Sequence, residues 1–120
     1  MQNGDCMDYL TIDIKSDMPP ADVAVANLEI EIESIKHSGI KLIKVIHGYG
    51  SHGVGGEIKR LMNERLLILK KQKKIKDYIN CEKLSDAYIK DKMLYENFPL
   101  LAVDDDLKNY NSGITLVLMN

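Results

Sequence analysis

Several residue types are scarce in this chain of 120 residues, which has no tryptophan, one phenylalanine and two cysteines. The core must therefore be aliphatic, built from isoleucine, leucine, valine and methionine. Cys6 and Cys81 lie far apart and form neither a metal-ligand spacing nor a disulfide framework, which favours a reducing cytoplasmic compartment. No apolar run approaches the roughly 20 residues that span a bilayer. The polar, acidic start at residues 1–6 is unlike a signal peptide, so no membrane partner is expected.

The net charge is also small, at −2, but the charges are unevenly distributed. Residues 1–35 carry eight acidic side chains and one lysine, and residues 77–120 carry eight acidic and four basic side chains. Residues 36–76 carry eleven basic and two acidic side chains. Clustered basic charge, rather than the total, indicates an anionic partner such as DNA or RNA.

The length predicts one domain, with residues 1–9 as a flexible N-terminus and residues 10–120 as the folded part. Residues 10–14 alternate between apolar and polar side chains, which is typical of a strand. Pro19-Pro20 precedes a helical repeat of apolar residues that continues to Gly39. Residues 28–32 also alternate like a strand, but the absence of a breaker between Pro20 and Gly39 favours a helix.

The rest of the chain continues the alternation of strands and helices. The patterns predict strands over 40–46, 75–79 and 114–119, helices over 54–73 and 84–97, and a solvated turn at Asp104–Asp106. This order predicts an α/β fold, a two-layer sandwich of order β-α-β-α-β-(α)-β with a mixed four-stranded sheet.

The most informative segment is the glycine-rich turn between the predicted strand 40–46 and the basic helix that follows it. Five of the eight glycines lie between Gly48 and Gly56. Free backbone N–H groups and the positive end of a helix dipole form a site for an anion, most often a phosphate. The residues predicted to bind phosphate are Gly48, Gly50, Ser51, His52, Gly53, Gly55, Gly56, Lys59 and Arg60.

Two nucleotide-binding motifs fit this turn poorly. Residues 48–53 satisfy G-x-G-x-x-G, but the acidic residue that should follow about 20 positions later falls within the basic run 70–76. Residues 55–58 lack the Lys-Ser/Thr pair of a P-loop. A nucleotide-dependent enzyme is therefore the weakest of the functional hypotheses.

Three side chains are the candidates for acid–base chemistry. His47 ends the predicted strand 40–46, where open α/β sheets place their binding crevices. An imidazole there can contact a phosphate or transfer a proton near neutral pH, or it can simply fix the turn by bonding a backbone carbonyl. Asp13 and Lys15 end the neighbouring strand, so both can reach the same crevice, although an acid at a strand end also commonly caps a turn.

These segments together resemble the small MutS-related (Smr) domain family. That family has a His-Gly-x-Gly turn after its second strand, and this chain reads Ile46-His47-Gly48-Tyr49-Gly50-Ser51. The family ends in Gly-Ile/Ala-Thr followed by an apolar strand, and this chain reads Ser112-Gly113-Ile114-Thr115-Leu116-Val117-Leu118. Pro19-Pro20-Ala21 also fits the start of the first helix, and the resemblance extends from Leu10 to Met119.

The chain departs from the family pattern at the first strand. Where the family has Asp-Leu-His-Gly, this chain keeps Asp13 but has Lys15 in place of the histidine and Ser16 in place of the glycine. The turn is lengthened by residues 53–56, and residues 84–97 add a helix. Lysine can neutralise phosphate charge but is a poor acid–base catalyst without a large pKa shift.

The resemblance implies a fold similar to the C-terminal domain of the bacterial translation initiation factor that binds the small ribosomal subunit. It also implies DNA or RNA binding, DNA-nicking or RNA endonuclease activity in some members, and a link to DNA repair. No resident cofactor or metal is expected, and Mg²⁺ is the candidate metal if the domain cleaves nucleic acid. The alternative is a non-catalytic adaptor whose basic helix 54–74 docks an acidic protein or the ribosome.

Overall fold

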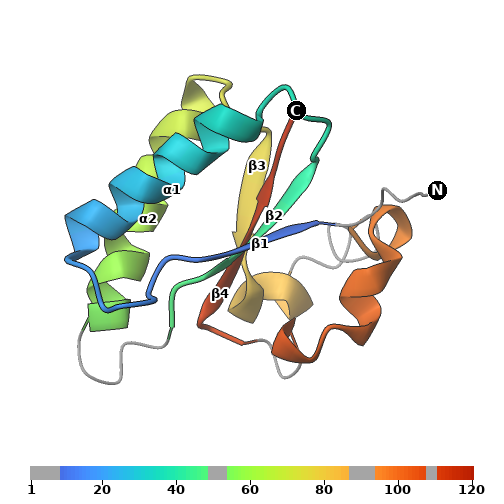
Figure 1. Cartoon of the computed structure of the whole chain (residues 1–120). Helices are drawn as coiled ribbons and strands as arrows, with labels where there is room; N and C mark the ends of the chain where they lie inside the picture. The colour runs from blue at the N-terminus through green and yellow to red at the C-terminus, as the bar shows by residue number, and fades with distance from the viewer. Residues whose placement is uncertain (1–8, 49–53, 87–93, 108–110) are drawn as a thin grey trace.

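The computed structural model describes residues 9–48, 54–86, 94–107 and 111–120, and within them four strands form one mixed sheet (Figure 1). The strands are β1 (Leu10–Asp13), β2 (Leu42–Ile46), β3 (Asp77–Asn80) and β4 (Ile114–Leu118). Their order is β1-β2-β4-β3, with β1 and β2 parallel and β4 antiparallel to both of its neighbours. The predicted α/β class and mixed four-stranded sheet are confirmed.

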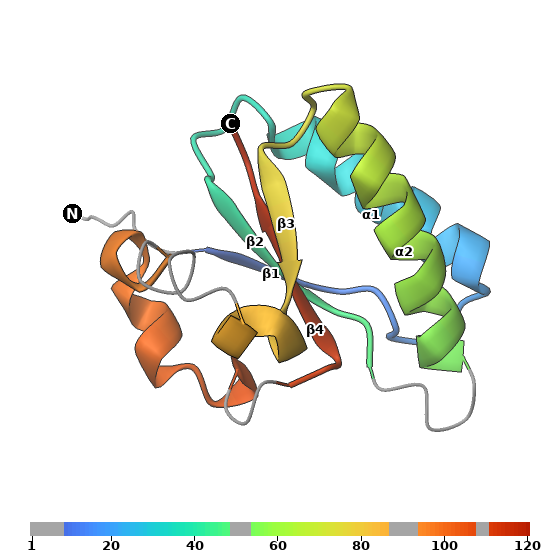
Figure 2. The same cartoon turned by 180° about the vertical axis from the view of Figure 1, so that it is seen from behind.

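Two helices, α1 (Ala21–Ile35) and α2 (Val54–Lys71), pack side by side on one face of this sheet (Figures 1 and 2). Their apolar stripes meet the sheet in one core, which includes Leu28 and Ile32 of α1 and Met62 and Leu66 of α2. The two carboxylate oxygens of Glu29 accept hydrogen bonds from the Arg65 guanidinium at 2.8 and 2.9 Å, which ties the helices together. The predicted helix over residues 28–32 is therefore correct. Neither helix is long and apolar enough to cross a membrane, nor is any other in the described parts of the chain.

The opposite face of the sheet is covered by the segment between β3 and β4 (Figure 2). Its short 3₁₀ helices are η2 (Cys81–Asp86), η3 (Pro99–Val103) and η4 (Asp105–Leu107), and residues 94–97 are α-helical. The predicted helix 84–97 is therefore only partly correct: residues 84–86 belong to a 3₁₀ helix, and residues 87–93 lie outside the described residues. The predicted two-layer arrangement describes the sheet with α1 and α2, but it does not include the segment that covers the other face of the sheet.

A buried lysine anchors this second layer. Lys44 on β2 is 6% exposed and donates to Asp104 Oδ2 and Asp106 Oδ2, each at 2.8 Å. The Tyr9 hydroxyl donates to the same Asp104 oxygen at 2.5 Å. The prediction of a solvated turn at Asp104–Asp106 is thus wrong for Asp104, because that carboxylate pairs with a cation beneath the segment.

Candidate functional site

The carboxyl ends of β1 and β2 lie next to each other, because the two strands are parallel and Asp13 is in register with Ile46. Asp13 Oδ1 accepts hydrogen bonds from the backbone N–H groups of Lys15, at 2.9 Å, and Ser16, at 3.0 Å. The Lys15 ammonium lies 3.6 Å from the other Asp13 oxygen, and the two side chains are 48% and 39% exposed. Asp13 therefore caps the turn after β1, whereas Lys15 presents a solvent-accessible cation.

Gly48 brings Lys15 into contact with the turn after β2. Its backbone has φ +81°, and a Cβ atom there would lie only 2.9 Å from Lys15 Cδ. The backbone N–H groups of His47 and Gly48 both donate to the Gly113 carbonyl, at 2.9 and 3.1 Å. Segments around residues 15, 48 and 113 therefore converge at one edge of the sheet.

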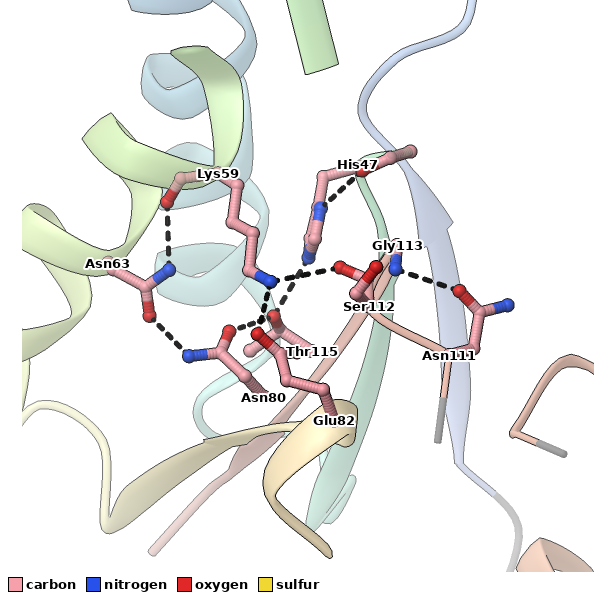
Figure 3. Close-up of polar contacts among 10 residues, drawn as sticks. His47, Lys59, Asn63, Asn80, Glu82, Asn111, Ser112, Gly113 and Thr115 are labelled. Atoms are coloured by element: carbon pink, nitrogen blue, oxygen red, sulfur yellow. Dashed lines mark hydrogen bonds and ion pairs between the residues drawn. The ribbon is translucent and has the colours of Figure 1, made fainter. Parts of the chain in front are cut away.

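His47 is completely buried and sits at one end of a chain of polar side chains (Figure 3). Its Nε2 lies 2.9 Å from Thr115 Oγ1, and the Thr115 hydroxyl donates to Asn80 Oδ1 at 2.6 Å. Asn80 Nδ2 donates to Asn63 Oδ1 at 3.0 Å, and Asn63 Nδ2 donates to the Lys59 backbone carbonyl at 2.8 Å. This series of hydrogen bonds connects the end of β2 with β4, β3 and α2.

The direction of each hydrogen bond in this series is set by its last acceptor, the Lys59 backbone carbonyl. A backbone carbonyl can only accept, so the Asn63 amide nitrogen must face Lys59, and the orientation of Asn80 follows. The Thr115 hydroxyl hydrogen is then committed to Asn80, which leaves its oxygen to accept from His47. A neutral His47 consequently carries its proton on Nε2. Its Nδ1 lies 3.1 Å from the Gly48 carbonyl oxygen and in this tautomer can donate to it only when the ring takes up a second proton.

The environment of His47 opposes a second proton. Burial is the main cause that lowers its pKa below the usual 6.5, and the nearby Lys59 ammonium acts in the same direction. The Gly48 carbonyl, whose effect is second to that of burial and larger than that of Lys59, raises the pKa, and the Glu82 carboxylate raises it least. Near neutral pH the ring is therefore neutral, and both of its nitrogens face groups of the protein rather than solvent.

Lys59 and Glu82 form an ion pair beside this histidine (Figure 3). The Lys59 ammonium donates to Glu82 Oε2 at 2.5 Å and to the Ser112 carbonyl at 3.0 Å. The second carboxylate oxygen, Oε1, is buried and has no hydrogen-bond partner among the described residues. Lys59 thus joins the start of α2 to the turn before β4, and its charge is largely balanced by Glu82.

The remaining predicted phosphate-binding residues fall into two groups. Gly55 and Gly56 belong to α2, and Arg60 is exposed but bonds to the Glu57 and Glu64 carboxylates on the same helix. Those two carboxylates raise the Arg60 pKa. The others, Gly50, Ser51, His52 and Gly53, lie outside the described residues, so the glycine-rich phosphate loop stays a prediction.

Cysteine chemistry and metal binding have little support in the described residues. Burial raises the pKa of the Cys81 thiol to about 12, so it carries no thiolate at neutral pH. The described part of the chain holds no cluster of three or more His, Cys, Asp or Glu side chains that could bind a metal ion. The Mg²⁺ expectation stays a prediction.

Sequence reasoning missed most of the partners of His47. Thr115 was part of the closing segment that resembles the Smr pattern, but nothing in its neighbourhood pointed to a hydrogen bond with His47. Asn80, Asn63 and Glu82 were not identified at all. The one signal in the sequence that could have indicated such a partner is the polar residue Asn80 at the end of β3, because β3 runs parallel to β2 and ends at the same edge.

No protein-family model matches this chain, and no curated protein or solved structure is significantly similar to it.

Proposed function

We propose that this chain is an Smr-like nucleic-acid-binding domain that contacts backbone phosphates at the carboxyl edge of β1 and β2. The observation that carries the proposal is the position of Lys15. Its side chain packs across Gly48 and remains half exposed, at the edge where open α/β sheets hold their ligands. Lys15 stands where the Smr family has a histidine, and it supplies a cation beside the turn after β2.

The geometry supports binding better than cleavage. A general acid or base must reach the reacting oxygens, and His47 is completely buried with both ring nitrogens against protein groups. Asp13 caps a turn through Oδ1 and pairs with Lys15 through Oδ2. In this proposal His47 holds the turn after β2 in place, and Lys15 provides the phosphate contact. The likeness to the ribosome-binding initiation-factor domain is part of the same proposal.

The adaptor alternative, in which the basic helix 54–74 docks an acidic protein or the ribosome, receives less support. Four basic side chains of α2 are already paired with carboxylates of this chain: Lys59 with Glu82, Arg60 with Glu57 and Glu64, Arg65 with Glu29, and Lys70 with Asp77. An acidic partner would have to displace these internal carboxylates, which reduces the gain from each new contact.

The test is a fluorescence-anisotropy titration of labelled single-stranded RNA, single-stranded DNA and branched DNA over a range of salt concentrations. Replacing Lys15 with alanine should weaken binding to all three and reduce the slope of log K against log[salt] by about 0.7–0.9, the value for one lost phosphate contact. Lys71→Ala is the matched control, because Lys71 is also exposed but is the last residue of α2, away from the edge formed by β1 and β2.

An unchanged affinity and salt slope in Lys15→Ala would overturn the assignment of the binding edge. The same samples incubated with Mg²⁺ test the second half of the proposal. Intact substrates are expected, and cleavage by the wild-type protein would overturn the proposal that this domain binds without cleaving.

A further inference from the structure

Basic side chains that are not used by the Lys15 edge gather at the other end of the sheet. The turn between α1 and β2, the turn between α2 and β3, and the end of β4 lie together there (Figures 1 and 2). They line a pocket of about 350 Å³ that is open to solvent. Its lining residues are Lys36, His37, Lys73, Lys74, Met119 and Asn120. This volume is within the range of small-ligand pockets, about 300–1,000 Å³.

The charge of this pocket is positive. Lys36 pairs with Glu33, and the described residues include no ion-pair partner for Lys73 or Lys74. Three lysines and one glutamate leave a net charge of +2 before any charge on His37. Lys74 and His37 are both close enough to Glu33 to lower its pKa, after the larger effect of Lys36, so these side chains share one electrostatic environment.

Compensation of helix dipoles does not account for these lysines. The dipole effect falls off within the last turn of a helix. The last turn of α2 already contains Lys70 and Lys71, whereas Lys73 and Lys74 follow the end of the helix. Lys70 and Lys71 therefore already stabilise the dipole of α2, without a contribution from Lys73 or Lys74.

Lys73 also occupies a backbone position that favours glycine. The Lys74 N–H donates to the Leu69 carbonyl and the Lys73 N–H to the Lys70 carbonyl, which is the Schellman arrangement at a helix end. Lys73 has φ +62°, where a side chain raises the energy of the backbone. The Asn120 side chain donates to the Lys73 carbonyl at 3.0 Å and holds this turn against the end of β4. Lys73 therefore places a charged side chain in the pocket wall, although the turn would be more stable with glycine at this position.

We propose that this pocket binds a small phosphorylated anion, with Lys73 and Lys74 as the main contacts and Lys36 and His37 completing the wall. The net charge of +2 matches a phosphate dianion, and ammonium groups are effective phosphate donors. The pocket is at the opposite end of the sheet from Lys15, so this site is independent of the proposed nucleic-acid edge.

The test is isothermal titration calorimetry with sodium pyrophosphate in a phosphate-free, low-salt buffer. The informative variant is Lys73→Gly, because glycine fits φ +62° better than lysine does. We expect affinity for pyrophosphate to fall about tenfold, the value of one lost charge-assisted hydrogen bond, while the Tm is unchanged or higher. Loss of binding without loss of stability separates ligand contact from folding. Lys74→Gln should weaken binding similarly.

One control isolates the pocket. Lys83→Gln removes an exposed lysine on η2, outside the pocket, and should not alter pyrophosphate affinity. The proposal is overturned if wild-type protein gives no binding heat and no Tm shift with millimolar pyrophosphate, or if Lys73→Gly binds as tightly as wild type. Displacement of pyrophosphate by a single-stranded oligonucleotide would overturn the assignment to a small ligand, whereas failure to displace it supports that assignment.

Discussion

Replacing Thr115 with valine should destabilise the fold far more than the loss of one hydroxyl on a surface would. Thr115 is completely buried, and its hydroxyl both accepts from His47 Nε2 and donates to Asn80 Oδ1. Valine keeps the shape of the side chain and can do neither. The substitution therefore interrupts the hydrogen bonds between the ends of β2 and β3, and it leaves the buried His47 Nε2 and the partly buried Asn80 Oδ1 unpaired.

The magnitude follows from those two partners. A buried polar group left without a hydrogen bond costs about 1–3 kcal/mol. His47 can recover part of this by moving its proton to Nδ1, which then donates to the Gly48 carbonyl. The expected loss is therefore about 2–3 kcal/mol in the free energy of unfolding. For a chain of this length, with about 250 cal/mol/K of unfolding entropy, the Tm should fall by about 8–12 °C.

The assay is urea unfolding followed by circular dichroism, with Thr11→Val as the matched control. Thr11 lies on the edge strand β1 and is exposed, so the same chemical change there should alter stability by no more than about 0.5 kcal/mol. ¹⁵N NMR of the imidazole provides a second readout: the proton should be on Nε2 in wild type and on Nδ1 in Thr115→Val. A Thr115→Val stability equal to that of the control, with an unchanged tautomer, would refute the hydrogen-bond chain.

Two further predictions concern buried charge. Because burial lowers the His47 pKa, the unfolded chain takes up this proton at a higher pH than the folded chain does, and the free energy of unfolding should decrease as the pH falls through about 6.5. His47→Gln should remove this part of the slope in urea titrations at a series of pH values, and an identical slope in both proteins would contradict it. Lys44→Met strands Asp104 without its cation and should cost about 3 kcal/mol in thermal unfolding. Adding Asp104→Asn should restore part of that loss, and purely additive losses would argue against the pair.

The secondary structure could be predicted well where a local pattern was unambiguous. The apolar repeat after Pro20 correctly indicated α1 rather than a strand, and the run before His47 correctly indicated β2. The apolar pattern predicts a helix to Lys73, whereas α2 ends at Lys71, because a lysine at the left-handed position gives no sequence signal of a helix stop. Within the helix expected over 84–97, residues 84–86 form the end of a 3₁₀ helix, and only residues 94–97 are α-helical among the described residues.

The candidate site was predictable in its location but not in its contacts. The parallel pairing of β1 and β2 was enough to bring Asp13, Lys15 and His47 to one edge. It could not indicate that Asp13 caps a turn or that His47 is fully buried, because both outcomes depend on groups brought in by other segments. The basic middle third of the chain likewise suggested one cationic helix face, but most of the α2 charges are paired with carboxylates from distant or neighbouring positions.

The sequence by itself determined the class of the fold and the edge at which the candidate site forms. Period-two and period-3.6 apolar patterns specify strands and helices locally, and parallel neighbours necessarily end on the same side. Only the tertiary structure decided that β4 enters between β2 and β3 and so places Thr115 between His47 and Asn80. It also paired most of the basic side chains of α2 with carboxylates, whereas Lys73 and Lys74 at the far pocket have no ion-pair partner among the described residues. Strand order and ion pairing depend on contacts between residues far apart in the chain, which no local pattern encodes.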